Sequence, residues 1–323
     1  MNNSSSSPFV RIENLKTWFP VKRGIFSSTV GYVKAVNNVS LTLQKGETLG
    51  LVGESGCGKT TLGRSIMGLE KIHSGNIWMN NSLINNLQSK DKRKIRKQIQ
   101  MVFQDPISSL NPRRMIMDIV TEGMIAHKLI AKKDKKDVSI KLLNEVGIES
   151  DVIYRYPHEF SGGQRQRISI ARAISMHPDI IICDEAVSAL DVSVQAQVIN
   201  LLMDLRDTHR FSYLFISHDL SVVNHISHRI VVMYLGQIVE MGQTNDIINK
   251  PYHPYTRALI ASIPVIGKKG NKIILKGTPP SPMHPPEGCT FHPRCSAAKS
   301  ICQKSAPKLN HVDGHDIRCH LYS

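Results

Sequence analysis

Long apolar runs are missing from this sequence, and no stretch approaches the roughly 18 consecutive apolar residues that a helix needs to cross a bilayer. The beginning of the chain, Met1 to Pro8, also has neither the basic start nor the apolar core of a secretory signal peptide. We therefore expect a short disordered leader over residues 1–7 and a protein that stays in the cytoplasm. Contact with a membrane must then come through partners or surface charge.

Acidic residues are comparatively few, since 26 Asp and Glu stand against 41 Lys and Arg and give a formal net charge of +15. Such an excess is compatible with nucleic acid, anionic lipid or a phosphate-rich ligand as the partner. The clearest basic runs are residues 90–97 and 128–136. A solvated helix face has the same composition, so charge alone does not choose between these partners.

Paired C-x-x-C spacings are also missing, although the chain has six cysteines. Four of them lie near the end of the sequence, with five, six and sixteen residues between them: Cys289, Cys295, Cys302 and Cys319. In a cytosolic protein, clustering of this kind favours a metal over disulfides. Four thiolates suit a [4Fe–4S] cluster or Zn²⁺. Four reduced thiols without a metal are the third possibility.

Alternating strands and helices dominate the pattern that is present. Residues 9–15, 39–43 and 48–52 indicate strands, and a helix follows over residues 59–69. Later, the apolar runs 180–183 and 211–216 indicate buried strands on either side of an amphipathic helix that contains Val194 and Leu205. Residues 229–234 and 237–241 indicate a hairpin that turns at Gly236. This order predicts an α/β fold with a mostly parallel sheet and helices on both faces.

Two regions depart from that alternation. Between residues 105 and 160 the spacing is helical, which predicts a small helical subdomain inserted into the α/β core. From about residue 245 the sequence becomes rich in Pro and Gly, which predicts an extended appendage without a second packed core. The chain has no internal repeat.

A phosphate-binding motif lies between the predicted strand 48–52 and the predicted helix that follows it. Its pattern is G-x-x-x-x-G-K-[ST], in which glycines let backbone N–H groups wrap phosphate oxygens at a helix N-terminus. Lys59 is expected to bridge the β- and γ-phosphates, and Thr60 is expected to place its hydroxyl on Mg²⁺. The residues that we expect to contact the nucleotide here are Gly53, Glu54, Ser55, Gly56, Cys57, Gly58, Lys59, Thr60 and Thr61.

Two carboxylates, Asp184 and Glu185, follow the buried run 180–183. Because side chains alternate along a strand, neighbouring carboxylates at its end can take different roles. We expect Asp184 to hold Mg²⁺ through water and Glu185 to polarise the attacking water. An Asp-Glu pair that caps a helix is the alternative interpretation.

The segment Phe160-Ser161-Gly162-Gly163-Gln164 closely resembles the signature motif of ABC ATPases, and it separates this chain from kinases and GTPases that share the P-loop. In that family the motif acts on ATP held by the P-loop of a partner, which implies a dimer closed around two nucleotides. Residues Ser161 to Gln164 are therefore expected to bind nucleotide across the dimer. Phe160 stands where leucine is usual and Ala186 where proline is common, but neither removes a group that touches phosphate, metal or water.

The resemblance assigns further residues one by one. Gln104 resembles the Q-loop glutamine, which touches Mg²⁺ and senses the membrane partner. Asp191, in Ser188-Ala189-Leu190-Asp191, resembles the D-loop aspartate, with a plain helix cap as the alternative. His218 resembles the switch histidine that contacts the γ-phosphate. Phe19, or alternatively Trp18, stands where the family places an aromatic ring on adenine, although either ring could belong to the core.

The resemblance to ABC ATPases covers about residues 8–250, and residues 251–323 look like the C-terminal extension of oligopeptide and dipeptide importer ATPases, in particular the F-type subunit. It implies a P-loop NTPase ABC cassette with a RecA-like sheet, an antiparallel β subdomain, an inserted helical subdomain and an irregular Cys-rich extension. Similar tails in this family have been associated with iron–sulfur clusters. The implied protein hydrolyses ATP at the cytoplasmic face of the membrane to drive uptake of peptides.

The implied partners are a second, paralogous ATPase, two transmembrane permeases that dock near residues 106–112, and an extracytoplasmic peptide-binding protein. One alternative is the same kind of ATPase serving uptake of nickel or another metal chelate. A soluble ABC ATPase that works on nucleic acid would use the net charge of +15, but only about 100 residues separate the P-loop from the signature, which leaves no room for a long coiled coil. We therefore expect no nucleic acid partner.

Overall fold

The computed structural model describes residues 7–24, 27–85, 87–263, 275 and 277–323. Residues 1–6 of the expected leader lie outside this part of the chain. The chain divides into two compact units, one formed by Met1–Gln44, Thr48–Leu87 and Ser217–Ser323, the other by Lys45–Glu47 and Gln88–Ile216. We call them the P-loop unit and the signature unit. Within the described residues, no helix combines the length and apolarity needed to cross a bilayer.

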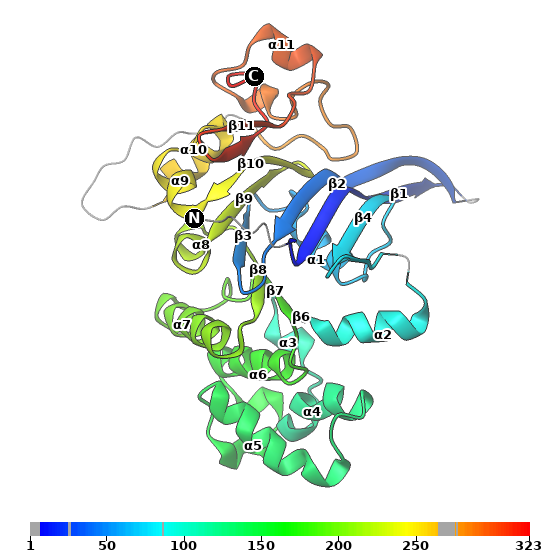
Figure 1. The fold of residues 1–323 in the computed structure, drawn as a ribbon, viewed down its shortest axis with the longest axis vertical. Helices are drawn as coiled ribbons and strands as arrows, with labels where there is room; N and C mark the ends of the chain where they lie inside the picture. Colours follow the sequence, from blue (N-terminus) through cyan, green and yellow to red (C-terminus); the bar gives the residue numbers. More distant parts are fainter. Residues whose placement is uncertain (1–6, 25–26, 86, 264–274, 276) are drawn as a thin grey trace. The chain divides into compact units, whose positions relative to one another are not determined.

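The P-loop unit contains an antiparallel sheet with the strand order β2-β1-β4-β5 (Figure 1). Its strands are β1 (Val10–Arg23), β2 (Ser28–Leu43), β4 (Ser74–Met79) and β5 (Ser82–Leu83). The expected strand at 9–15 is thus present but continues to Arg23. Several register shifts interrupt the pairing of β1 with β2, and these bulges break the alternation that a sequence pattern needs.

A second set of strands in this unit has the order β11-β12-β10-β9-β3. The strand β3 (Thr48–Val52) is buried at every position and pairs in parallel with β9 (Arg229–Tyr234), which is buried after its first residue, as expected for two mostly apolar strands of a parallel pair. The expected hairpin is confirmed, since β9 turns at Gly236 into the antiparallel strand β10 (Gln237–Gln243). Two helices flank this region, α1 (Lys59–Ile66) and α8 (Leu220–Ile226).

The extension after residue 245 is more ordered than an extended appendage. Its helical elements are α9 (Thr244–Asn249), α10 (Pro254–Ala261), the 3-10 helix η4 (His292–Arg294) and α11 (Ser300–Lys304). Its strands β11 (Asn310–Val312) and β12 (His315–Ile317) form a hairpin, and β12 pairs with β10. The expectation failed because five of the prolines lie close together between residues 279 and 286, while Ile317 and Cys319 pack with Tyr252 in a small apolar cluster.

The signature unit has three parallel strands in the order β8-β7-β6. They are β6 (Ile99–Val102), β7 (Ile180–Asp184) and β8 (Ser212–Ser217), and β7 and β8 are buried throughout. The amphipathic helix expected after residue 190 is α7 (Val192–His209), which buries Val198, Leu202 and Leu205. The basic run at 90–97 lies in helix α2 (Ser89–Gln98).

Between residues 105 and 160 the signature unit contains helices only, as expected for the inserted region. They are α3 (Pro106–Ser109), α4 (Ile116–Ala126), η1 (Lys132–Asp134), α5 (Lys135–Glu145), η2 (Ser150–Tyr154) and η3 (Pro157–Glu159), and helix α6 (Gly162–Ile174) follows them.

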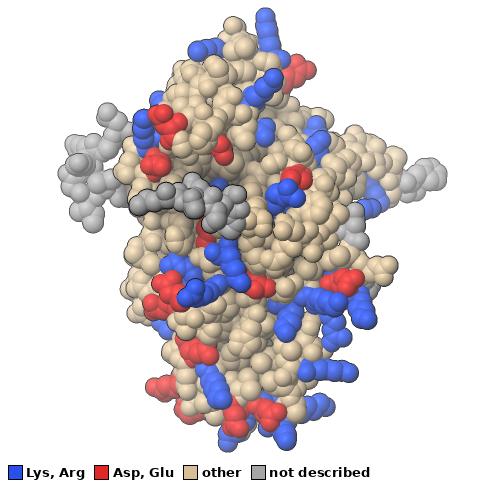
Figure 2. Space-filling model, in the orientation of Figure 1, with Lys and Arg blue, Asp and Glu red and all other residues tan. Residues whose placement is uncertain are grey.

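On the face drawn in Figure 2, Lys and Arg side chains are interspersed with Asp and Glu and do not form one continuous basic groove.

Candidate functional site

The P-loop glycines adopt backbone conformations that other residues rarely reach. Gly53 and Gly58 have φ angles of 154° and 106°. A Cβ atom on Gly53 would lie 2.2 Å from the carbonyl oxygen of Met233, and one on Gly58 would lie 2.0 Å from that of Ala35. Neighbouring backbone therefore excludes side chains at both positions, which is why the motif demands glycine there.

Lys59 occupies the centre of this loop. Its side chain is buried, and its Nζ donates hydrogen bonds to the carbonyl oxygens of Gly53, at 2.8 Å, and Glu54, at 3.1 Å. Burial raises the pKa of the Cys57 thiol, so this neighbour of Lys59 stays neutral. The ammonium group is thus held by two carbonyl oxygens of the loop itself, and these are partners that it can exchange for phosphate oxygens.

The two aromatic candidates for adenine stacking differ in their surroundings. Phe19 lies opposite Val33 in the pairing of β1 with β2 and is 36% exposed. Trp18 is already stacked on His73, with ring centroids 4.3 Å apart, and lies near the ammonium groups of two lysines. Only Phe19 of the two therefore presents a ring surface that a base could cover.

In the signature unit, the structure brings two predicted catalytic residues together. Gln104, which follows β6, donates a hydrogen bond from Nε2 to Oε2 of Glu185 at 2.9 Å. Asp184 is the last residue of β7 and is 4% exposed. The carboxylate of Glu185 is partly exposed, and its φ of 49° lies in the left-handed region, which is costly for a residue with a side chain.

This strained conformation is supported by the turn that follows. The N–H of Glu185 donates to the carbonyl oxygen of Ile216 at 3.0 Å, and Ser188 donates to the carbonyl oxygen of Glu185 from both N and Oγ. Asp191 stands at the N-cap of α7, but its exposed side chain makes no capping hydrogen bond there. The simple helix-cap interpretation of Asp191 therefore finds no support in the contacts of this segment.

The signature residues form the N-terminus of α6. Ser161 Oγ accepts from the N–H of Gln164 at 3.3 Å, and Gln164 Oε1 accepts from the N–H of Ser161 at 3.0 Å, which is a capping box. Gly163 packs closely on α7, since a Cβ there would lie 2.5 Å from Cγ1 of Val194. The N–H groups of the first helical turn, at Gly162 and Gly163, have no acceptors within an α-helix.

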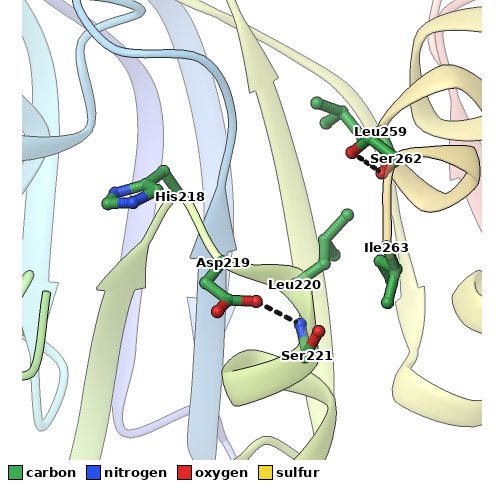
Figure 3. A pocket seen from close by; sticks show the side chains of 7 residues that line it. All are labelled: His218, Asp219, Leu220, Ser221, Leu259, Ser262 and Ile263. Carbon is green, nitrogen blue, oxygen red and sulfur yellow. Dashed lines mark hydrogen bonds between the residues drawn. The ribbon is translucent and has the colours of Figure 1, made fainter. Parts of the chain in front are cut away.

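His218 follows β8 and belongs to the P-loop unit by its contacts. It borders a cavity of about 240 Å³ that is also lined by residues of α8 and of the extension (Figure 3). The exposed imidazole points away from Leu259 and Ser262, which lie across the cavity at the end of α10. Asp219 caps α8 by accepting from the N–H of Ser221 at 2.8 Å, which fixes the loop that carries His218.

The four tail cysteines are gathered in the extension. The N–H of Cys289 donates to the carbonyl oxygen of Cys302 at 2.8 Å, and Cys319 lies in the apolar cluster with Tyr252. Burial raises the pKa of Cys289 to about 11, and repulsion from Cys302, Cys319 and Cys295 adds to that rise. Within the described residues, however, no three His, Cys, Asp or Glu side chains are placed to hold a single metal ion.

Comparison with known proteins agrees with this arrangement. Residues 36–188 match the family described as ABC transporter, and residues 239–302 match the one described as oligopeptide/dipeptide transporter, C-terminal region. The oligopeptide transport ATP-binding protein AppF of Bacillus subtilis is 49% identical over the full length of both chains. The chain belongs to the ATP-binding proteins of the oligopeptide and dipeptide ABC transporters.

Other members of the family give the same result. The dipeptide transport ATP-binding protein DppF of Haemophilus influenzae is 46% identical, with 97% of both chains covered. Among solved structures, the dimeric ATP-binding cassette MJ0796 bound to ADP and Pi is similar with a TM-score of 0.65 and 26% identity, over 73% of this chain and 98% of that one. This ABC ATPase therefore has the P-loop NTPase cassette fold that its sequence implied.

Sequence reasoning missed two residues that touch the P-loop. The hydroxyl of Tyr255 accepts a hydrogen bond from the N–H of Glu54 at 2.8 Å, and Arg294 forms an ion pair with the Glu54 carboxylate. Both residues belong to segments that resemble the family extension. No spacing rule connects positions more than 200 residues apart with a phosphate loop, so no signal in the sequence could have assigned these contacts.

Proposed function

We propose that this ABC ATPase powers the uptake of oligopeptides or dipeptides across the cytoplasmic membrane, as a peripheral subunit on the cytoplasmic face. The observation that supports a peptide as the transported substrate is the full-length similarity to peptide transport ATP-binding proteins, including the match of the extension. A paralogous ATPase, two permeases and an extracytoplasmic peptide-binding protein complete the proposed transporter. The exposed Ile107 at the start of the helical region is a candidate contact for a permease.

The chemistry that we propose begins at the P-loop. Lys59 and the N–H groups of residues 53–61 hold the β- and γ-phosphates, and the ring of Phe19 covers the adenine. Mg²⁺ suits the available donors, since Thr60 supplies a hydroxyl and Asp184 a carboxylate, which are oxygen ligands of the kind that this ion prefers. Bound there, the ion would neutralise charge that develops on the phosphate oxygens.

Hydrolysis is assigned to residues that follow the strands β6, β7 and β8. Glu185 takes the proton of the attacking water, and Gln104 orients that carboxylate through the 2.9 Å hydrogen bond. His218 contacts the γ-phosphate from the loop after β8. Ser161, Gly162, Gly163 and Gln164 offer the N-terminus of α6 to the γ-phosphate of ATP held by the partner subunit, and Asp191 communicates across the same interface.

An uptake assay tests this proposal in cells whose own copy of the gene is deleted. Cells complemented with the wild-type chain should accumulate a radiolabelled tripeptide, and cells complemented with Glu185→Gln should not. Glu149→Gln changes an exposed glutamate elsewhere in the signature unit and should leave uptake intact. Restored uptake of radioactive nickel in place of the peptide would establish the metal-chelate alternative and refute the peptide cargo.

For the cysteine tail, we propose a [4Fe–4S] cluster held by Cys289, Cys295, Cys302 and Cys319. Four cysteine thiolates are the ligands that such a cluster uses in proteins. The N–H of Cys289 donates to the carbonyl oxygen of Cys302, so these two cysteines lie side by side in the tail. Purification under strict anaerobiosis should give a brown protein with about four irons per chain, and a colourless, iron-free sample would refute this assignment.

A further inference from the structure

Glu54, the second residue of the P-loop, is held by the C-terminal extension. Its N–H donates to the hydroxyl oxygen of Tyr255 at 2.8 Å, and its carboxylate accepts from both terminal nitrogens of Arg294, at 2.6 and 3.0 Å. Its carbonyl oxygen accepts from Nζ of Lys59 at 3.1 Å. Glu54 thus connects the extension directly to the lysine that lies in the phosphate site.

The Arg294 contact is stronger than an ordinary surface ion pair. Its side chain is only 6% exposed, against 27% for Glu54, and its guanidinium lies 5.9 Å from the centre of the Tyr234 ring. A two-pronged bond between Arg and a carboxylate fixes both distance and orientation. Because the pair is shielded from water, salt and solvent weaken it less than they weaken exposed pairs.

The two extension residues are themselves fixed by packing. Tyr255, in α10, and Phe291, next to η4, both pack on Tyr234 with ring centroids 4.8 and 5.1 Å away. All three rings are almost fully buried. Tyr234 ends β9, one residue after Met233, whose backbone carbonyl limits Gly53. The aromatic cluster therefore presents the Tyr255 hydroxyl and the Arg294 guanidinium from a rigid base beside the loop.

The extension also contacts β2, the strand that pairs with the segment of β1 that contains Phe19, the residue expected to stack on adenine. The N–H of Lys34 in β2 donates to the carbonyl oxygen of Pro282 at 3.1 Å. The preceding residue, Val33, is the cross-strand partner of Phe19. The extension therefore contacts both the phosphate side and the base side of the P-loop unit.

We propose that Arg294 and Tyr255 are positioning residues for the nucleotide, which act through Glu54 to hold the P-loop and Lys59 in the conformation that receives phosphate. The glycine framework and Lys59 itself remain when either residue changes. Loss of one contact should therefore weaken nucleotide binding without abolishing it. This proposal concerns nucleotide binding alone and does not depend on the cargo or on the metal content of the tail.

Fluorescence titration of the full-length chain with a mant-labelled ADP and Mg²⁺ tests the proposal, because ADP binding requires only the P-loop side of the site. We expect Arg294→Met to raise the Kd about tenfold, because both charge-assisted hydrogen bonds to the Glu54 carboxylate are lost. Arg294→Lys should recover part of that loss. Tyr255→Phe keeps the aromatic cluster and removes only the hydroxyl, and it should raise the Kd about threefold.

Two controls separate positioning from a general loss of structure. Arg257→Met removes an arginine whose contacts, to Pro251 and Tyr322, stay within the extension, and it should leave the Kd unchanged. In a Glu54→Gln background, Arg294→Met should have little further effect, because the route through the carboxylate is already broken. A Kd of Tyr255→Phe and Arg294→Met within twofold of the wild type would overturn the proposal. So would a tenfold effect of Arg294→Met that persists without the Glu54 carboxylate.

Discussion

The P-loop and the signature helix are supported over very different distances along the chain, although both are glycine-rich helix starts suited to phosphate. The capping box of α6 joins Ser161 to Gln164, three residues apart. Glu54 of the P-loop forms hydrogen bonds with Tyr255 and Arg294, which follow it in the sequence by 201 and 240 positions. The signature helix is therefore held by its own sequence, whereas the P-loop depends on how the extension folds.

The difference has a functional consequence. A motif that is capped locally keeps its shape whenever its helix forms, because the cap and the helix are the same segment. A loop that is braced from a distant segment can respond to the state of that segment. If Arg294 and Tyr255 position the P-loop as we propose, the nucleotide affinity of this unit depends on residues outside the phosphate loop.

Glu185→Gln gives the largest effect that this comparison predicts, and it tests the signature unit. The Gln side chain can still accept the hydrogen bond from Gln104, so the geometry is kept while the base is lost. ATP hydrolysis should fall by about 10²–10⁴-fold, the usual contribution of a general base. Binding of mant-ATP should stay within about threefold of the wild type. Turnover at the wild-type rate would remove Glu185 from the catalytic role.

The contrast also explains which features the sequence could predict. The P-loop, the Asp184-Glu185 pair and the signature are contiguous, and the physical requirement behind each is local: a glycine turn, a strand end or a helix cap. The proximity of Gln104 and Glu185 also follows a simple rule. Both residues come directly after parallel neighbouring strands, whose carboxyl ends meet at one edge of the sheet.

Contacts without such a rule escaped prediction. The bonds of Glu54 to Tyr255 and Arg294 depend on where the extension packs, and its proline-rich composition suggested no packing at all. The pairing of β12 with β10 was missed for the same reason, since β12 has only three residues and carries no readable alternation. Tertiary packing decided both features, and a single sequence does not contain that information in readable form.

Gly163→Ala gives the next largest effect, and it sharpens the view that the signature helix is fixed locally. Ala normally stabilises a helix relative to Gly. Here its Cβ would lie 2.5 Å from Val194, so we expect a loss of about 1–3 kcal/mol from overpacking, read as a lower Tm. Gly162→Ala is the matched control, because its nearest neighbour would be 3.7 Å away. Equal stability of the two variants would contradict the packing argument. Adding Val194→Ala to Gly163→Ala removes the close contact and should bring the Tm back up.

The smallest effect concerns His253, which is buried where the extension contacts Glu240 of β10. Its N–H donates to Oε2 of Glu240 at 2.9 Å, and its Nδ1 accepts from the N–H of Tyr255, which caps α10. Burial lowers the pKa of His253 to about 3, far below that of an exposed histidine, so the folded protein keeps this ring neutral. The unfolded chain takes up the proton near pH 6.5.

Stability from His253 is therefore complete above pH 6.5 and declines as the pH falls, because the unfolded state binds more protons in that range. Between pH 7 and pH 6 the loss should be about 0.7 kcal/mol, and this value hardly depends on how far below 6 the folded pKa lies. His253→Asn supplies another side chain able to cap α10 but has no titrating group. The fall in Tm from pH 7 to pH 6 should be smaller in this variant than in the wild type. An identical fall would mean that His253 takes up its proton in the folded protein as readily as in the unfolded chain. Water would then reach the start of α10, which contains Tyr255, more easily than the burial of His253 indicates.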